Sequence, residues 1–568
     1  MNAARKVDNN HTPDVAEVKT IAVMQLTRFG DVIQTFQAAK ELKAEHPEVR
    51  LVLIARKKFA NPLSFLLGSV FDKIHTFDFK EMAEGKGYNQ TADALTSFIN
   101  TLSAENIDVL VNLSFSKSSA YLAQLIKAKN KLGMVYDERN QLQIKDRWSQ
   151  FVYSNVMGSA YTGINLVDVF KFIFGVRSTK TASIMNDQTP SKKLVVHAFA
   201  SNAKKRWRVN KWVEVLFKTL KDHENLEVIL VGDKNEQASA EQIRTAPVLE
   251  PYLSRIQNVA GKIGLLELTR LFDKETLFVG HDSMVGHLAA IRGSRIITVS
   301  LGTVRPSETT PYIAGAYNIA PRSKCFPCFP QDKCDLHQCH ADIPYQVVAG
   351  ALGLALKGEE INSKSMEKAT SLFHLSSVDI FKSTFTNAGL LDIKSQINHE
   401  PLIADVFRQV YRVTWLYALA GLEEHQNFPA LSSNGHKELL ARMSGLQYLF
   451  ELCEFGMKYS RYILEEISCQ TPSLAKIKDF SKKIDEIDSL QAMVKKTNPQ
   501  LAPIIDFFAV AKANLVGNNL VELTESSYLA FDDSRLVSSV VYDLLEKIVA
   551  EYKIKTTVGK MSKEEYHR

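Results

Sequence analysis

The sequence predicts an α/β fold of two doubly wound lobes followed by an all-α C-terminal domain. Short β-rich runs alternate with amphipathic segments from Ile21 to about Val176, and the same alternation restarts near Leu194. After about Gly358, these runs give way to long stretches with helical spacing. Because sheets of this kind bind ligands beyond the carboxyl ends of their strands, we expect the two lobes to face a cleft.

The length of the chain indicates several domains. Its 568 residues exceed the roughly 100–200 of one domain, and its 45% apolar and 23% charged residues are ordinary for a globular protein. We divide the chain into a flexible leader (1–19), a first lobe (20–176), a linker (177–193), a second lobe (194–357) with a cysteine-rich loop (325–339), a helical domain (358–555) and a flexible tail (556–568).

Charge and hydropathy exclude some classes of protein. A net charge of +6 over this length is far from the dense basic patches of a nucleic-acid binder, so no nucleic-acid partner is expected. The leader lacks the apolar core of a secretory signal, and no run approaches the roughly 18 apolar residues of a membrane span. We expect a cytoplasmic protein, and peripheral contact with the inner membrane stays open.

The first candidate site is the stretch "QLTRFGDVIQT", residues 25–35, which follows the first strand-like run. Gly30 allows a tight turn there. Asp31 is either a helix cap or a general base that takes a proton from an acceptor hydroxyl in a closing cleft.

The second candidate site is "HAFASNAKKRWRVNKW", residues 197–212, at the start of the second lobe. Its cations Lys204, Lys205, Arg206 and Arg208 lie between a strand end and a helix start, a place that suits a phosphate. The other interpretation is a solvated basic loop in which Trp207 is a packing anchor.

The third candidate site lies in "FVGHDSMVGHLAAIRGSRIITVSLGT", residues 278–303. A buried strand delivers Asp282 and Ser283 to the start of a helix, with His287 one turn later. Free backbone N–H groups and the helix dipole at that start favour a diphosphate, although the Asp-Ser pair is also a good ordinary N-cap.

Together these sites resemble the ADP-heptose heptosyltransferases, glycosyltransferase family 9, over about residues 20–355. The resemblance rests on Gly30-Asp31 after the first strand, on His197 with Lys205-Arg206-Trp207, on Gly232 and Glu236 of "VGDKNE", and on Asp282-Ser283 with His287-Leu-Ala-Ala. It implies a GT-B fold, in which two Rossmann-like lobes face a cleft, with the acceptor on the first lobe and the nucleotide-sugar donor on the second. Met284 stands where the family usually has a glycine.

The resemblance also implies roles for individual residues. Asp31 and Lys205 are the expected catalytic residues: Asp31 deprotonates the acceptor hydroxyl, and Lys205 stabilises the departing diphosphate in an inverting transfer. No catalytic metal is expected. The expected donor-binding residues are His197, Lys205, Arg206, Gly232, Glu236, Asp282, Ser283, Met284 and His287.

Basic residues near the strand ends of the first lobe are candidates for the acceptor. The triplet Arg56-Lys57-Lys58 follows the second strand-like run and suits an acidic or phosphorylated acceptor, such as the inner core of lipopolysaccharide, unless it is merely solvated. The expected acceptor-binding residues are Arg28, Gly30, Arg56, Lys57, Lys58 and Lys117.

Four cysteines lie within fifteen residues, at Cys325, Cys328, Cys334 and Cys339. Four thiolates in so short a loop suit a structural zinc or iron ion in a tetrahedral site. Two local disulfides are the competing interpretation, which a reducing cytoplasm disfavours.

Two functions remain open at this point. The first is a bacterial glycosyltransferase that moves a heptose or related sugar from a nucleotide-sugar donor, ADP-heptose above all, to a lipopolysaccharide core or a protein side chain. The alternative is a decayed pair of lobes that binds a nucleotide sugar or a glycan as a scaffold. The additional helical residues suggest a protein acceptor, a partner or an oligomer interface.

Overall fold

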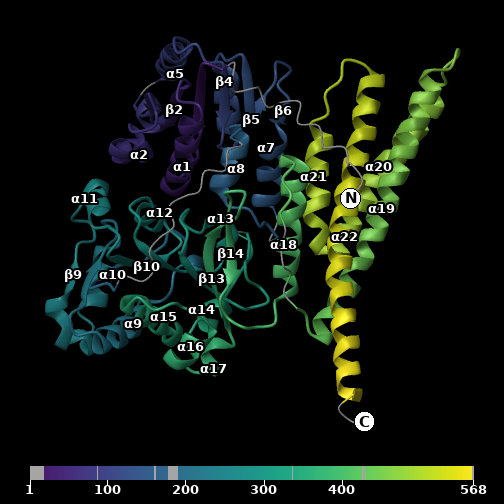
Figure 1. The fold of residues 1–568 in the computed structure, drawn as a ribbon. Helices are drawn as coiled ribbons and strands as arrows, with labels where there is room; N and C mark the ends of the chain where they lie inside the picture. The colour runs from purple at the N-terminus through teal and green to yellow at the C-terminus, as the bar shows by residue number, and fades with distance from the viewer. Residues whose placement is uncertain are drawn as a thin grey trace.

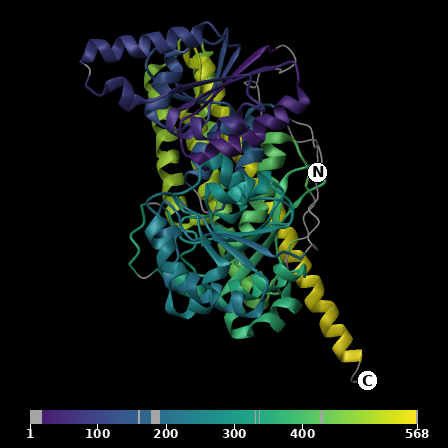
Figure 2. The same ribbon diagram turned by 90° about the vertical axis from the view of Figure 1, so that its left-hand side faces the viewer.

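The computed structural model describes residues 18–565 apart from 86, 159–160, 177–189, 330, 336, 425–427 and 429, and describes no side chain beyond 551. Two α/β lobes lie one above the other, and a set of long helices runs along one side of both (Figures 1 and 2). The predicted fold class is therefore confirmed. The leader up to residue 17 and most of the predicted linker lie outside the described residues.

The first lobe is built on a six-stranded sheet in the order β3-β2-β1-β4-β5-β6, in which only β6 runs antiparallel to its neighbour. The central strand is buried along its whole length, as expected for parallel strands covered by helices on both faces. The elements are β1 (Thr20–Gln25), α1 (Phe29–Glu45), β2 (Arg50–Arg56), α2 (Lys57–Ala60), α3 (Ser64–Leu67), β3 (Lys73–Phe77), α4 (Phe79–Ala83), α5 (Tyr88–Ser103), β4 (Val109–Asn112), α6 (Lys117–Leu125), β5 (Asn130–Tyr136), β6 (Leu142–Lys145), α7 (Arg147–Phe151) and α8 (Leu166–Ile173).

The second lobe is built on an eight-stranded sheet in the order β14-β13-β12-β11-β10-β7-β8-β9. Its six strands from β12 to β9 are parallel, whereas β13 and β14 are antiparallel additions at one edge. The strands are β7 (Lys193–His197), β8 (Glu227–Leu230), β9 (Ile256–Asn258), β10 (Thr276–His281), β11 (Arg295–Val299), β12 (Tyr317–Pro321), β13 (Val378–Phe385) and β14 (Leu391–Ser395). The helices are α9 (Val209–Asp222), α10 (Gln237–Arg244), α11 (Leu265–Arg270), α12 (Met284–Ile291), α13 (Pro306–Thr309), α14 (Gln338–Asp342), α15 (Tyr345–Lys357), α16 (Ser363–Ala369) and α17 (Leu372–Leu375).

The second lobe extends beyond the boundary predicted at residue 357. Strands β13 and β14 form a hairpin whose turn is closed by the Thr386 N–H, which donates to the Leu390 carbonyl at 2.9 Å, with Gly389 at φ +67°. Glycine adopts this left-handed conformation without steric cost. The sequence has strand-like runs at these positions, but the long helical segments around them led to the prediction of an all-helical region.

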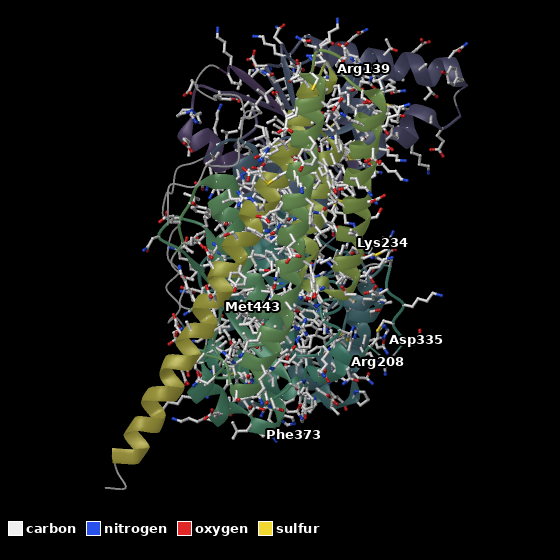
Figure 3. The ribbon with its side chains drawn as sticks, turned by 90° about the vertical axis from the view of Figure 1, so that its right-hand side faces the viewer. Arg139, Arg208, Lys234, Asp335, Phe373 and Met443 are labelled. Carbon is white, nitrogen blue, oxygen red and sulfur yellow. The ribbon has the colours of Figure 1, made fainter. Side chains whose placement is uncertain are left out.

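The helical region begins at about residue 403. It comprises α18 (Ile403–Trp415), α19 (Ser433–Ile467), α20 (Leu474–Thr497), α21 (Ala502–Ala513) and α22 (Leu520–Glu565). Helix α22 continues to Glu565, inside the segment 556–568 that the sequence predicts to be a flexible tail. Figure 3 shows α19, α20 and α22 side by side along the two lobes.

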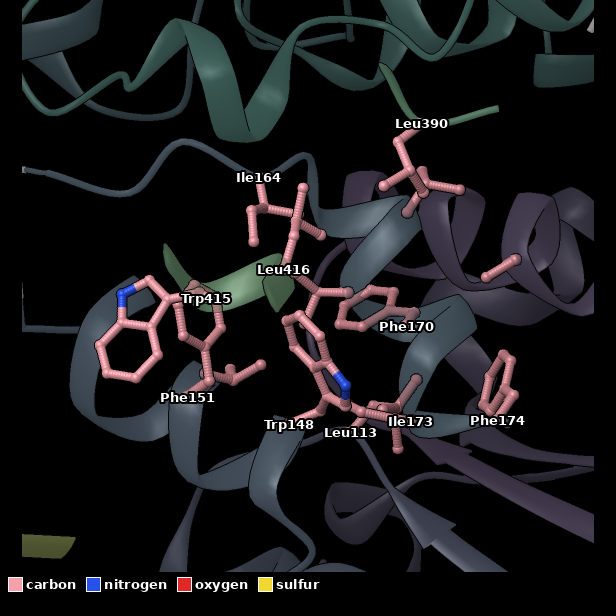
Figure 4. Packing of buried hydrophobic residues seen from close by; sticks show 14 of the residues in the cluster. Leu113, Trp148, Phe151, Ile164, Phe170, Ile173, Phe174, Leu390, Trp415 and Leu416 are labelled. Atoms are coloured by element: carbon pink, nitrogen blue, oxygen red, sulfur yellow. The ribbon is translucent and has the colours of Figure 1, made fainter. Parts of the chain in front are cut away.

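Helix α18 joins the helical region to both lobes. Trp415 and Leu416 pack among Trp148, Phe151 and Phe170 of the first lobe (Figure 4). The fully buried Arg412 donates hydrogen bonds to the Gly163 carbonyl at 2.9 Å and to the Leu391 carbonyl at 3.0 Å. These contacts make α18 part of the shared core and not an appended module.

Candidate active site

The donor-side candidate residues follow the carboxyl ends of β7 and β10 in the second lobe. Lys205 Nζ lies 2.9 Å from Asp282 Oδ2, and the two side chains are 21% and 11% exposed. Burial by itself would raise the pKa of Asp282, but Lys205, His287 and Thr309 outweigh it and hold that pKa below its usual value. Lys205 and Asp282, two predicted donor-side residues from distant motifs, thus form an ion pair.

His287 links the two lobes. It is buried, and burial lowers its pKa in spite of the opposing charges of Asp282 and Asp31. Its Nδ1 has no hydrogen-bond partner among the described residues. A Cβ added to Gly30 would lie 3.9 Å from His287 Cδ2, so the start of α1 approaches α12 closely at this point.

Asp31 makes a capping contact at the start of α1. The Arg28 backbone N–H donates to Asp31 Oδ2 at 3.1 Å. The residue remains partly exposed at the cleft, facing the lobe that carries His287. Capping therefore orients the carboxylate without burying it.

The start of α12 is not capped by its own serine. Ser283 Oγ is 3.0 Å from His197 Nδ1, and no side chain caps the first turn of the helix. Met284 is the first residue of α12 and is partly buried against the core. The Gly286 N–H donates to the Ser283 carbonyl at 3.2 Å, so the Met284 and Val285 N–H groups and the helix dipole are the features of this helix start that can attract an anion.

Glu236 folds back onto its own loop. Its Oε2 accepts from the Asp233 backbone N–H at 2.8 Å and lies 3.5 Å from His197 Nε2. Burial tends to raise the pKa of Glu236, but His197, Asp233 and the exposed Arg206 hold it below its usual value. A Cβ at Gly232 would meet that Oε2 at 2.9 Å, so a larger residue there would displace the Glu236 carboxylate. These donor-side predictions form one connected group.

His281 is a site residue that the sequence analysis missed. It is buried, and its Nε2 accepts from the Trp207 backbone N–H at 3.0 Å and from Trp212 Nε1–H at 3.3 Å. Burial lowers its pKa to about 3, so it is neutral and free to accept these bonds. Trp207 belongs to the lysine loop, by which we mean residues 201–208. By holding Trp207, His281 therefore also positions Lys205. A histidine directly before Asp282 was the available signal.

Glu308 was missed as well. It lies in α13, is buried, and its Oε1 has no hydrogen-bond partner among the described residues. Burial raises its pKa to about 8, and the negative charge of Asp282 contributes in the same direction. No motif around Glu308 pointed to this behaviour, since burial and the nearness of Asp282 arise only in the folded protein.

The predicted acceptor residues flank Asp31 on the neighbouring strand ends. Arg28, Lys58 and Lys117 are exposed, and Arg56 and Lys58 lie 5.4 Å and 5.6 Å from the ring centre of Phe59. Lys57 differs because its Nζ is 2.9 Å from Glu81, on α4. Among these basic residues, Lys57 is therefore the one whose charge is already paired with a carboxylate in the described part of the chain.

The cysteine-rich loop supports the lysine loop. The Cys328 N–H donates to the Gly302 carbonyl at 3.0 Å, and Lys204 Nζ donates to the Phe329 carbonyl at 3.3 Å. His340 Nε2 lies 2.8 Å from the Lys204 carbonyl. The residue beside Lys205 is thus held by the loop that carries the cysteines.

In the structure, the four cysteine side chains are not arranged as a metal site. Cys339 is buried, and its pKa is raised by burial and then by the nearby Cys325, Cys328 and Cys334. In the described part of the loop and of the rest of the chain, no three Cys, His, Asp or Glu side chains are grouped to hold a metal ion. The thiols are neighbours, but the structure does not support the predicted zinc or iron.

No helix within the described ranges combines the length and the apolar character that crossing a bilayer requires.

Comparison with known proteins agrees with this geometry. Residues 95–338 match Glycosyltransferase family 9 (heptosyltransferase). The lipopolysaccharide core heptosyltransferase OpsX of Haemophilus influenzae is 24% identical over 305 residues, which are 52% of this chain and 82% of that protein.

Solved structures are similar at lower identity. E. coli ADP-heptose lps heptosyltransferase II is 16% identical, with a TM-score of 0.44, over 60% of this chain and 98% of that one. E. coli heptosyltransferase WaaC with ADP is also 16% identical, with a TM-score of 0.40, over 52% and 91% of the two chains. The dodecameric iron-containing heptosyltransferase TibC is 13% identical, with a TM-score of 0.33, over 62% and 76%.

The family match runs from α5 of the first lobe to the cysteine-rich loop of the second, across the lysine loop and the Asp282 helix start. Residues 95–338 are therefore similar to glycosyltransferase family 9, the heptosyltransferases, and the chain is a glycosyltransferase.

Proposed function

We propose that this protein transfers a heptose or a related sugar, with inversion, from ADP-heptose to a lipopolysaccharide core sugar or a protein side chain. The family match supports sugar transfer, and the similarity to OpsX, a lipopolysaccharide core heptosyltransferase, supports the core acceptor. The reaction takes place in the cytoplasm, and an acceptor in the membrane would bring the protein to the inner surface of that membrane.

The observation that carries this proposal is the placement of Asp31 opposite the Lys205–Asp282 pair, with His287 between the lobes. In an inverting transfer, one base acts on the acceptor while cationic groups stabilise the leaving group on the other side of the sugar. Asp31 Oδ2 is engaged by the helix start, so Oδ1 is the oxygen that takes the acceptor proton.

The leaving diphosphate binds at the start of α12. Lys205 and the free N–H groups of the first turn stabilise its charge, so no metal ion is needed for that step. Asp282 holds Lys205 in place through the 2.9 Å contact. His197, with Ser283 on one ring nitrogen and Glu236 near the other, connects the diphosphate end of the donor to the nucleoside end.

The acceptor lies over the strand ends of the first lobe. Arg56 and Lys58 beside Phe59, with Arg28 at the helix start, provide positive charge near Asp31 for an acidic or phosphorylated sugar. Gly30 keeps the approach to Asp31 free of a side chain. Helix α21 packs on α7 of this same lobe, which supports a contribution of the helical region to the choice of acceptor or partner.

The test is sugar transfer by purified full-length protein with ADP-, GDP- and UDP-linked sugars, measured by mass spectrometry of the acceptor. We expect transfer from ADP-heptose and a loss of about 10²–10⁴-fold in Asp31→Asn, the usual contribution of a general base. Asp93→Asn, an exposed acid of the same lobe, is the control. Donor binding without turnover for any acceptor would refute the proposal in favour of a scaffold.

A further inference from the structure

A cavity lies where the start of α13, the end of β12 and the start of α18 meet. The other end of α13 carries Thr309, which contacts Asp282. The volume of the cavity is about 70 Å³. By the usual requirement of about 10–15 Å³ for one water, it has room for a small ion with its contacts. Phe326, Phe381 and Ile393 supply apolar walls, and three arginines line it: Arg305, Arg322 and Arg408.

Arg322 is the arginine with complete partners. Its Nη1 lies 2.6 Å from Asp379 Oδ2, and its Nη2 donates to the Glu400 carbonyl at 2.7 Å. The Ser395 hydroxyl donates to the other oxygen of Asp379 at 2.5 Å. Arg322 and Asp379 therefore form a neutral wall of the cavity.

Arg408 is the least satisfied of the three. Its side chain is 9% exposed, and its Nη1 is buried without a hydrogen-bond partner among the described residues. Its Nε lies 3.6 Å from Asp405 Oδ1, which is longer than a charged hydrogen bond. Asp405 also lines the cavity, and burial raises the pKa of its carboxyl group.

Arg305 repeats this pattern. Its Nη1 donates to the Val156 carbonyl at 2.9 Å, and its Nε is buried without a partner in the described part of the chain. Its carboxylate neighbour Glu308 is 3.6 Å away, and burial raises the pKa of Glu308 to about 8. The cavity thus holds two guanidinium groups with buried N–H atoms that lack a partner among the described residues, and the carboxyl group beside Arg305 keeps its proton near neutral pH.

We propose that this cavity is a binding site for a small oxyanion, a carboxylate or a phosphate, held by Arg408 and Arg305. Planar guanidinium groups bind the oxygens of these anions in a fixed geometry, and apolar walls strengthen the interaction by excluding water. An anion would supply the missing partner of Arg408 Nη1. The proposal does not depend on the identity of the transferred sugar. The anion is either free phosphate or an acidic group of the acceptor.

The experiment is isothermal titration calorimetry of the full-length protein with inorganic phosphate. We expect saturable binding that falls about 10-fold or more in Arg408→Met, as loss of a hydrogen bond to a charged group predicts. Arg442→Met, an exposed arginine of α19, is the control and keeps wild-type affinity. Lys205→Met must also retain binding, since phosphate at the start of α12 would be lost in that variant.

A second variant protects the result against misfolding. Arg305→Met is expected to weaken phosphate as well, and the melting temperature of each variant without phosphate shows whether it is folded. Phosphate affinity that is unchanged in both folded arginine variants, or lost only in Lys205→Met, would overturn the proposal.

The source of the anion follows from transfer assays. Phosphate that competes with the acceptor in wild type but not in Arg408→Met identifies an acidic group of the acceptor as the natural ligand. Phosphate that binds through Arg408 without changing transfer identifies a free anion. Both results support the site.

Discussion

The two lobes differ in how far their candidate site residues are paired and buried. On the second lobe, Lys205 and Asp282 are paired and mostly buried before any substrate is present, and His281 and the cysteine-rich loop hold the lysine loop from behind. On the first lobe, Arg28, Lys58 and Lys117 are exposed side chains. A diphosphate has a constant shape, so a rigid site can bind it tightly. A large acceptor is bound better by an open, charged surface.

The largest test of this difference is Lys205→Met. We expect transfer to fall about 10²–10³-fold, the range for removing one electrostatic stabiliser of a developing charge. The variant also leaves Asp282 without its cation, so its free energy of unfolding should fall by about 1–3 kcal/mol, less than the about 3–5 for a fully buried pair. Transfer assays and chemical denaturation measure the two effects.

Arg208→Met is the matched control, because Arg208 is an exposed cation of the same loop, labelled in Figure 3. We expect near wild-type transfer and stability from it. Equal losses in the two variants would mean that the lysine loop acts through its general charge and not through the pair with Asp282.

The acceptor side should show a smaller and salt-dependent effect. We expect the double variant Arg56→Gln/Lys58→Gln to raise the KM for the acceptor about 3–10-fold with kcat nearly unchanged, because exposed charges are screened beyond about 8–10 Å at moderate salt. Lys57→Gln should change less, since Lys57 is already paired with Glu81. Steady-state kinetics at low and high salt measures this.

Lys80→Gln, at an exposed position on α4, serves as the control for that experiment. A fall in kcat in the double variant, insensitive to salt, would show that the acceptor side is as preformed as the donor side.

Because Glu308 is buried, we expect the stability of the second lobe to depend on pH. Burial raises its folded-state pKa from 4.5 to about 8, so the folded protein holds this proton more tightly than the unfolded chain does. The associated stability is complete below the unfolded value and is lost as the pH rises through about 8. We expect the melting temperature to fall between pH 6 and pH 9, and to fall less in Glu308→Gln, as measured by calorimetry.

Glu360→Gln, an exposed carboxyl group of the same lobe, should keep the wild-type pH profile. A Glu308→Gln profile identical to that of the wild type would show that this carboxyl group does not hold its proton near neutral pH.

The smallest effect is expected at the cysteine-rich loop. If the loop draws its four thiols around zinc or iron, elemental analysis should find about one metal ion per chain, and Cys325→Ser should remove it. Because the loop supports Lys204, loss of the metal should raise the KM for the donor a few-fold and leave the KM for the acceptor unchanged. Cys469→Ser, exposed on the helical region, is the control.

Freshly purified protein without bound metal would contradict the inference, drawn from the spacing of the four cysteines, that the loop binds a metal ion. It would leave the loop as a support held by hydrogen bonds alone, as the described residues show it.

Local patterns predicted most of the fold and the individual motifs. The alternation of strands and helices, the Gly30-Asp31 turn and the Asp282-Ser283 helix start are consequences of residues adjacent in the chain. The hairpin of β13 and β14 was missed although its pattern is local, because it interrupts a long helical stretch. The continuation of α22 beyond residue 555 was missed because polar composition resembles that of a loose tail.

The sequence by itself determined the two α/β lobes, the order of the motifs and the residue types of the candidate site, since these depend on periodicity and on short spacing. Only the tertiary structure decided which groups are buried together. Folding pairs Lys205 with Asp282 and places His281 against Trp207 of the lysine loop. It also buries Glu308 and Arg408 away from water. Burial changes the pKa of a group and the strength of its contacts, and it depends on neighbours that lie far away in the chain.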